Sequence, residues 1–177
     1  MPTARRAQIV EAAIDTIATE GLAATSFAKI ARTAGLSSTG LISYHFASKR
    51  ELMDEVVRAV TGELADAVAD RMRAADGAAE RLRAYLTATI EFAGEHHRRL
   101  RAAREIAPAA GGDGLEALLR AGQLAGEFRF FDVAVMALAV RAVRDGVLDR
   151  LATEPGLDIG TCTEELGTTF ELATRGA

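Results

Sequence analysis

Apolar residues recur at spacings of three and four positions through most of the chain. This is the period of an amphipathic helix, in which such positions fall on one face. Glycine, proline and capping residues interrupt the pattern and mark the ends of each segment. The helices predicted in this way cover residues 4–20, 26–34, 38–45, 48–74, 78–96, 98–106, 115–126, 132–153 and a last segment from 161 onward.

Polar side chains mark several of the predicted helix starts. Ser26 and Asp132 are expected N-caps, whose side-chain oxygens accept hydrogen bonds from amides of the first turn. Residues 48–51 and 161–164 each fit a capping box, in which a glutamate three positions after the cap reaches back to it. The glycine-rich residues 111–114 predict a flexible connection between two of the later helices.

Composition favours an all-helical protein. The 177 residues include 37 alanines and only three prolines, and aromatic residues make up 5%. Alanine is the best helix former, whereas strands favour branched and aromatic residues. We therefore expect an all-α fold of about nine helices. The three short helices at the start predict an N-terminal domain over residues 1–47, followed by a larger helical bundle over residues 48–177.

Charge is distributed unevenly along the chain. The net charge is −4, but residues 1–50 carry six basic and three acidic side chains, so the basic excess lies at the N-terminal end. This division favours two functions in one chain. A single cysteine, Cys162, excludes an internal disulfide and a multi-cysteine zinc site. With no long apolar run and no signal-peptide pattern, we expect a cytoplasmic protein without membrane contact.

Residues 27–46 carry the most informative pattern, which is helix, tight turn and helix. Gly35 suits the turn, and Ala31 is small enough for two helices to cross closely. The second helix begins with residues 37–40, where hydroxyls and free backbone amides can bind phosphate, and Gly40 lets the backbone come close to DNA. This arrangement is typical of a helix-turn-helix, whose second helix lies in the major groove. An ordinary helical hairpin is the alternative interpretation.

The first fifty residues resemble the DNA-binding domain of the TetR (tetracycline repressor) family of bacterial transcriptional regulators. The resemblance covers about residues 5–53, whereas the rest of the chain resembles the family only in its plan of long helices. The residues that carry the resemblance are Ile9, Ala12, Ala13, Ile17, Gly21, Thr25, Ser26, Ile30, Ala31, 34–37, Gly40, Leu41, 44–46, Ser48, Lys49, Glu51 and Leu52. It implies a protein, most often a repressor, that binds operator DNA as a dimer and is released when a small molecule binds the C-terminal domain.

By position, the resemblance implies DNA contacts from the second helix, the third helix and the lysine that precedes the fourth. The residues concerned are Thr25, Ser26, Ser38, Thr39, Gly40, Ser43, Tyr44, His45 and Lys49. Lys49 suits a phosphate contact that is blind to sequence. Thr25 and Ser26 also suit phosphate, although Ser26 is equally well explained as a cap. The chain departs from the family at Ala28, where a charged side chain is common, and this puts the operator sequence in doubt.

The third helix carries the candidates for reading base edges. Ser38, Thr39 and Ser43 suit that role, and one good contact discriminates between bases by about 1–3 kcal/mol. Ser43 replaces an aromatic residue that is common in the family. For Tyr44, a phosphate contact through the hydroxyl and packing on the first helix are both open. For His45, a DNA contact and a structural role are both open.

The larger bundle is expected to enclose a ligand pocket between helices. Candidate lining residues are Met72, Leu82, Tyr85, Leu86, Thr89, Ile90, Phe92, Leu118, Leu119 and Met136. Few of them are polar, so the expected ligand is apolar or amphipathic, and plain core residues are the alternative for each. His96 and His97 favour a helix junction over a metal site, because adjacent helical residues point about 100° apart. No metal and no cofactor are expected.

A homodimer is expected through the eighth and ninth predicted helices, which cover 132–153 and 161 onward. Ala139, Ala142 and Gly146 are small and allow close helix approach. A twofold interface would hold two recognition helices roughly 34–36 Å apart, which is one turn of DNA. The partners expected are therefore operator DNA, a small-molecule effector and a second copy of the chain.

Two other classes of function are alternatives to a DNA-binding regulator. An all-α enzyme is disfavoured, because the sequence shows no paired carboxylates, no nucleophile with a base and no glycine-rich phosphate loop. A helical adaptor that binds another protein would not need the hydroxyl-rich third helix with its trailing lysine. We therefore expect a regulator and not an enzyme.

Overall fold

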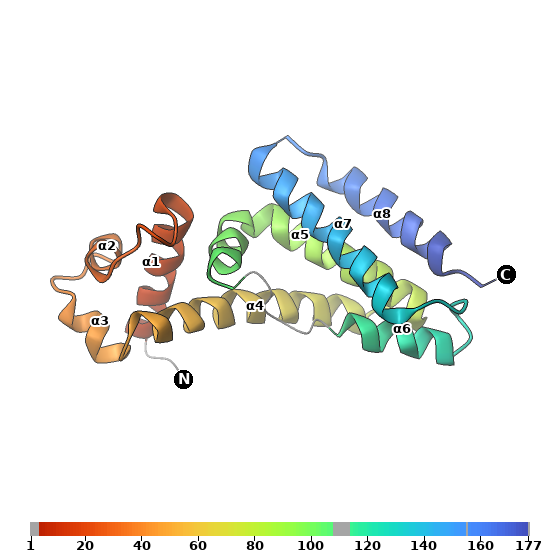
Figure 1. The fold of residues 1–177 in the computed structure, drawn as a ribbon, viewed down its shortest axis with the longest axis horizontal. Helices are drawn as coiled ribbons and strands as arrows, with labels where there is room; N and C mark the ends of the chain where they lie inside the picture. The colour runs from red at the N-terminus through yellow and green to blue at the C-terminus, as the bar shows by residue number, and fades with distance from the viewer. Residues whose placement is uncertain (1–3, 108–113, 155, 177) are drawn as a thin grey trace. The chain divides into compact units, whose positions relative to one another are not determined.

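A computed structural model describes residues 4–107, 114–154 and 156–176 of the chain. Within these residues the fold is all-α, as predicted, and the only extended pairing is one isolated bridge between Phe128 and Arg175. The helices are α1 (Ala4–Glu20), α2 (Phe27–Thr33), α3 (Gly40–His45), α4 (Lys49–Arg73), α5 (Gly77–Ile106), α6 (Leu115–Leu124), α7 (Val133–Thr153) and α8 (Ile159–Thr174) (Figure 1). None of them has the length and apolarity needed to cross a membrane.

The described residues form eight helices where about nine were predicted. The two helices expected over 78–96 and 98–106 are one element, α5, with a kink at His96. His96 has φ −125° and ψ 26°, outside the helical range, and its ring lies 4.5 Å from that of Phe92. The predicted junction is therefore in place, but helical turns continue on both sides of it. The predicted eighth and ninth helices correspond to α7 and α8.

Most of the predicted helix starts are confirmed. The side chains of Ser26 and Asp132 accept hydrogen bonds from the amides three residues on, at 3.4 and 3.0 Å. Ser48 does the same at 3.1 Å, and the carboxylate of Glu51 reaches back to the amide of Ala47 at 2.8 Å. Each of these bonds satisfies a backbone amide that has no partner inside its helix.

The last helix begins earlier than predicted. Asp158 is its N-cap, and the carboxylate accepts from the amide of Thr161 at 3.1 Å and from the Thr161 hydroxyl at 2.7 Å. Thr161 is therefore a first-turn residue, and the capping box predicted over 161–164 is wrong, because the helix already begins at Ile159 and Asp158 occupies the cap position. Of the predicted connection over 111–114, residues 111–113 lie outside the described residues.

The chain packs as two compact units, one within residues 1–63 and 98–111 and the other within residues 64–97 and 112–177. In the first unit α1 packs on α2, and the core is dominated by isoleucine. Arg99, near the end of α5, belongs to this unit and pairs with Glu11 of α1 and Glu63 of α4. These units are a division by packing, and the functional division at residue 47 stays a prediction.

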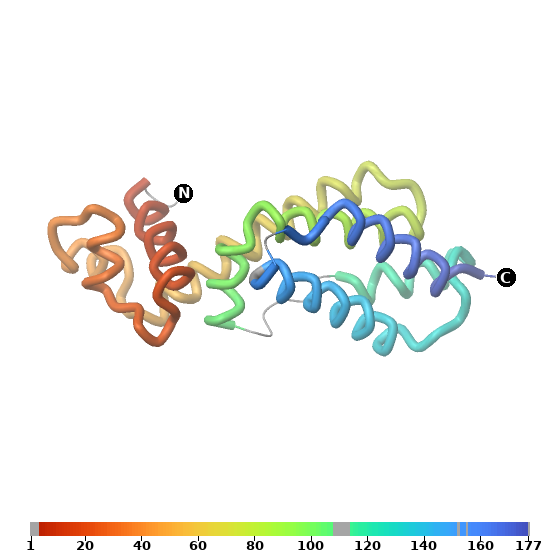
Figure 2. The backbone as a smooth tube through the Cα atoms, turned by 90° about the horizontal axis from the view of Figure 1, so that it is seen from above, coloured from red at the N-terminus to blue at the C-terminus, as the bar shows by residue number. Residues whose placement is uncertain are grey.

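The second unit is a bundle of long helices around one apolar core. In both views α7 and α8 run alongside each other (Figures 1 and 2). Its buried core consists of Ala78, Leu82, Tyr85, Leu86, Leu115, Leu118, Leu119, Phe128, Ala137, Val140 and Phe170. The core therefore draws on α5, α6, α7, α8 and the segment between α6 and α7.

Gly122 lets α6 approach the rest of this core. A Cβ at this position would come within 2.8 Å of the Cβ of Ala78 and still closer to the buried ring of Phe128. We expect Gly122→Ala to destabilise the fold by roughly 2–3 kcal/mol, because overpacking outweighs the gain in helix propensity. The melting temperature should fall by about 4–10 °C in thermal unfolding followed by circular dichroism.

Gly62 in α4 is the matched control, because a Cβ there meets nothing within 4 Å. Gly62→Ala should stabilise the protein by about 0.5–1 kcal/mol. A rise in melting temperature for both variants would contradict the packing assigned to Gly122.

Candidate nucleic-acid interface

The turn between α2 and α3 is built as the sequence predicts. Gly35 has φ +65°, a left-handed conformation that glycine adopts without steric cost. Its amide donates to the carbonyl of Arg32 at 3.1 Å, and the amide of Leu36 donates to that of Ala31 at 2.8 Å. These bonds close the end of α2 and set the direction in which the chain enters α3.

One residue anchors α3 in the core of the first unit. Ile42 is fully buried, whereas Leu41 is 37% exposed. Leu41 is among the residues that carry the family resemblance, but the short helix turns Ile42 inward instead. Phe46, directly after α3, is also buried, as expected. The remaining surface of α3 is therefore free to face a partner.

The exposed surface of α3 carries the predicted base-reading side chains. Ser38, Thr39, Gly40, Ser43 and Tyr44 are all exposed. Their chemistry is two serine hydroxyls, one threonine hydroxyl, a phenol and bare backbone. Hydroxyls of this kind bind base edges or phosphates. The structure thus brings six of the nine predicted DNA contacts onto one short helix and its start, and five of them, all but His45, are exposed.

Tyr44 and His45 are distinguished by their exposure. The Tyr44 side chain is 83% exposed, so the alternative in which it packs on α1 is wrong. Its ring instead meets that of His45 edge-on, with centroids 5.1 Å apart. His45 is half-buried. An exposed phenol beside a partly covered imidazole leaves Tyr44 as the freer of the two to reach a partner.

Neither backbone conformation nor packing within the described residues requires glycine at position 40. Its φ is not positive, and an added Cβ would meet only the hydroxyl oxygen of Ser38, at an ordinary 3.5 Å. Within the described residues the fold would accept a side chain here. This agrees with the expectation that Gly40 allows a partner to approach the backbone.

Thr25 and Lys49 are joined to each other. Thr25 is buried, and its hydroxyl donates to the carbonyl of Gly21 at 2.8 Å. The Lys49 ammonium donates to the carbonyl of Thr25 at 2.6 Å and so connects the start of α4 to the loop before α2. An ammonium has three donors, so this bond does not exhaust Lys49. Ser26 is exposed and caps α2.

Arg6 holds the C-terminal end of α3 in place, a role that the sequence analysis missed. Its guanidinium donates to the carbonyl of His45 at 2.7 Å and to the carboxylate of Glu55 at 2.9 Å. It also lies 4.2 Å above the ring of Phe46. The hydrogen bond from Arg6 is the main cause that lowers the pKa of Glu55. No local pattern could reveal this group, because its members lie 39 or more positions from Arg6 in the chain.

Part of the positive charge near this surface is neutralised inside the first unit. Lys29 and Arg32 both pair with Glu20, at 2.5 and 3.7 Å. The hydrogen bond from Lys29 is the main cause that lowers the pKa of Glu20, so the carboxylate stays charged. The candidate surface is therefore mainly one of hydroxyl and aromatic groups.

The predicted ligand contacts lie in the interior of the second unit. Met72 and Met136 are half-buried, and the other eight are buried. The hydroxyl of Tyr85 accepts from Arg144 at 2.7 Å, and that of Thr89 donates to the carbonyl of Tyr85 at 2.7 Å. These side chains pack as core in this structure, and their contact with a ligand stays a prediction.

Comparisons with known proteins agree with the N-terminal motif. Residues 9–56 match the sequence model of the family described as bacterial regulatory proteins, tetR family. A relative from Klebsiella pneumoniae (strain 342), the HTH-type transcriptional regulator BetI, is 42% identical over 86 residues. That match covers 48% of this chain and 44% of the relative, so the chain matches less than half the length of that regulator.

Solved structures match over nearly the whole chain. A regulatory protein of the tetR family from Rhodococcus RHA1 has a TM-score of 0.83 at 19% identity and covers 99% of both chains. The regulator FadR from Bacillus subtilis, solved in complex with stearoyl-CoA, has a TM-score of 0.76 at 18% identity and covers 92% of this chain and 95% of its own. At such identities the likeness concerns the fold. The N-terminal residues 9–56 of this chain are thus similar in sequence to the tetR family of bacterial regulatory proteins, and its helical fold is similar along nearly its whole length to that of solved proteins described as members of that family.

Proposed function

We propose that the protein is a transcriptional regulator that binds operator DNA as a dimer and is released by a small ligand. The observation that carries the proposal is the exposed polar surface of α3, anchored by Ile42 and held at its end by Arg6. A helix that is buried on one side and presents hydroxyls on the other suits the major groove. Acting on bacterial DNA, the protein would work in the cytoplasm.

An apolar stripe on α7 supports the dimer. Val135 and Leu138 are 63% and 65% exposed, and Ala139, Ala142 and Gly146 continue the same face. Spacings of three and four place these residues in a line along one side of the helix. Exposed apolar surface of this kind marks an interaction site, and small residues allow two helices to approach closely. We assign this face to a second copy of the chain, with α8 beside it.

Release by a ligand is supported by the nature of the second unit. A relative in fold, FadR from Bacillus subtilis, was solved with stearoyl-CoA. The predicted contacts in this chain are mostly apolar, so we propose an apolar or amphipathic effector. Because these side chains are packed as core, the ligand would have to bind a rearranged state, and it could shift the population only by its preference for that state.

Selection of bound duplexes from a random pool tests the proposal. A palindromic sequence is expected, with half-sites separated by one or more helical turns, since a twofold dimer reads each half-site in the same way. If the purified protein retains no duplex at low ionic strength, the proposed function is wrong.

Lys49→Ala tests the phosphate contact. We expect affinity to fall for specific and random duplexes alike, and the slope of log K against log salt to decrease by about 0.9, the share of one phosphate. Fluorescence anisotropy at several salt concentrations measures both quantities.

Arg50→Ala is the control for Lys49→Ala, because Arg50 is the next residue in the chain, is also basic and has a side chain that is 91% exposed. It should leave the slope nearly unchanged. A change of sequence preference alone in Lys49→Ala would contradict the role assigned to this residue.

A further inference from the structure

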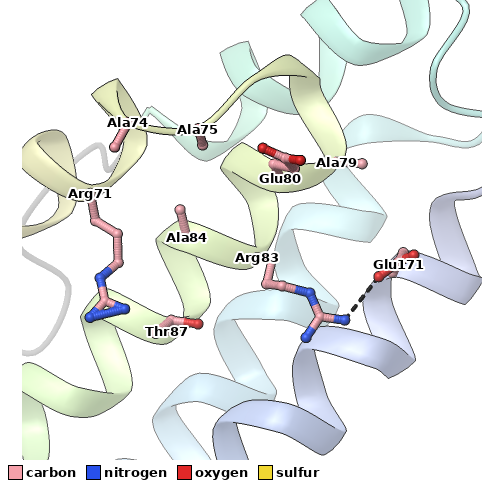
Figure 3. A pocket seen from close by; sticks show the side chains of 9 residues that line it. All are labelled: Arg71, Ala74, Ala75, Ala79, Glu80, Arg83, Ala84, Thr87 and Glu171. Carbon is pink, nitrogen blue, oxygen red and sulfur yellow. Dashed lines mark hydrogen bonds and ion pairs between the residues drawn. The ribbon is translucent and has the colours of Figure 1, made fainter.

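A pocket of about 610 Å³ opens between the end of α4, the start of α5 and α8 (Figure 3). No sequence pattern predicted this pocket, and it shares no residue with the predicted ligand contacts. Four alanine methyl groups contribute its apolar lining, two from the connection between α4 and α5 and two from α5. Arg71, Arg83, Thr87, Glu80 and Glu171 supply its polar groups. The volume is within the range of about 300–1,000 Å³ found for small-molecule sites.

The two arginines have hydrogen-bonding capacity beyond their present bonds. Arg71 donates from Nη2 to Glu91 of α5. Arg83 donates from the same atom, Nη2, to Glu171 at 2.8 Å and to the Thr168 hydroxyl at 3.3 Å. A guanidinium has five N–H donors, so most of the donors on each group are not used in these bonds. Both side chains are partly exposed and can adjust to a ligand.

The carboxylates of the pocket are already engaged. Glu80 accepts from the amide of Asp76 at 2.9 Å, where it serves the start of α5. Glu171 is held by Arg83, whose hydrogen bond is the main cause that lowers the pKa of this carboxyl. The lining contains no aromatic ring, so it lacks the cage that recognises quaternary ammonium groups. The polar groups still available to a ligand are therefore guanidinium donors, which bind a ligand that carries hydrogen-bond acceptors.

We propose that this pocket binds a small organic anion, with a carboxylate or phosphate head on Arg83, a short apolar part against the alanines and the positive charge of Arg71 elsewhere in the same lining. Guanidinium groups match the planar oxygens of such heads and bind them with two parallel hydrogen bonds. The anion competes with Glu171 for Arg83. The inference concerns binding to the free protein and stands apart from the proposed DNA binding.

Two substitutions break the same ion pair and should act in opposite directions. Arg83→Gln removes a donor to the anion and should weaken binding at least about tenfold. Glu171→Gln removes the internal competitor, keeps the size of the side chain and should strengthen binding several-fold. If the Arg83–Glu171 pair only joined α5 to α8, both variants would change the affinity for the anion in the same direction. The direction of the Glu171→Gln effect therefore tells whether Arg83 binds the anion or only stabilises the fold.

Isothermal titration of the free full chain with four probes of equal chain length provides the measurement. Hexanoate and hexyl phosphate should each bind at one site per chain, and the stronger of the two identifies the head group. Hexanol and hexylamine should bind at least about tenfold more weakly, because they offer no anion.

Three results would overturn the proposal. The first is that hexanol binds as tightly as hexanoate. The second is that neither hexanoate nor hexyl phosphate binds up to the highest concentration tested. The third is that Glu171→Gln weakens the binding of the anion. Should Arg83→Gln fail to fold, Arg71→Gln carries the same expectation of weaker anion binding, and unchanged affinity in that variant overturns the proposal.

Discussion

Leu138→Glu is expected to convert the dimer into a monomer and to lower operator affinity at least about a hundredfold. The side chain is 65% exposed in the single chain, so the substitution should leave the fold of the chain intact. In the proposed dimer the same position is covered, and an unpaired carboxylate there costs several kcal/mol. Operator binding falls because the two recognition helices no longer bind as one linked pair.

Leu124→Glu is the matched control for this prediction. Leu124 of α6 is 85% exposed and lies outside the α7 stripe, so the same charge change should leave the protein dimeric. Light scattering coupled to size-exclusion chromatography measures the mass of both variants at micromolar concentration. A monomeric wild-type protein, or a dimeric Leu138→Glu variant, would show that the apolar face of α7 is not the interface.

Arg6→Met is the second prediction, with an expected loss of roughly 1.5–3 kcal/mol in stability and about tenfold or more in operator affinity. The variant removes the charged hydrogen bonds from Arg6 to Glu55 and to the carbonyl of His45. The partly covered carboxylate of Glu55 then lacks its main hydrogen-bond donor. Methionine keeps most of the apolar stem and its packing. The end of α3 then loses its clamp, and DNA affinity falls because the helix must be ordered on binding.

The pH dependence of stability provides an internal check on Arg6→Met. The folded-state pKa of Glu55 lies below its ordinary value of 4.5, chiefly because of the hydrogen bond from Arg6. The stabilisation of the folded state by the ionised Glu55 is therefore fully present above pH 4.5 and is lost as the pH falls through the lower, folded-state pKa. The difference in melting temperature between wild type and variant should narrow on acidification through this range.

Arg58→Met serves as the control, because Arg58 also pairs with Glu55 but is 65% exposed. Exposed ion pairs contribute little, so its effect on stability should stay within about 0.5 kcal/mol. Equal losses in the two variants would contradict the special position of Arg6.

Local features of the fold could be predicted because they depend on neighbours in sequence. Ser26, Ser48 and Asp132 cap their helices through amides three residues away. Gly35 forms the turn of the motif through its own backbone conformation. The one cap predicted incorrectly, at residue 161, failed because a competing aspartate lay just upstream. Such errors concern a few positions at a helix end.

Contacts between distant segments were not predictable in this way. The Arg6 clamp joins α1 to the end of α3 and to α4, and the bond from Lys49 to Thr25 joins α4 to the loop before α2. Arg6 had counted only as one of the basic residues of the N-terminal end, and Thr25 and Lys49 had been interpreted only as DNA contacts. Since many partners at many separations are compatible with one arginine, only the packed fold selects among them.

The periodicity of apolar residues and the alanine content were sufficient to predict an all-helical chain, and the motif over residues 27–46 was sufficient to predict a helix-turn-helix. They were sufficient because helix formation and turn geometry follow from short-range sterics and hydrogen bonds. The likeness to the TetR family came in addition, from a resemblance of particular residues over about 5–53. The choice of Ile42 over Leu41 as the buried residue of α3, the clamp at Arg6 and the arginine-lined pocket of α4, α5 and α8 emerged from the folded arrangement. Each depends on side chains from separate helices meeting in space, and one-dimensional periodicity carries no information about which helices meet.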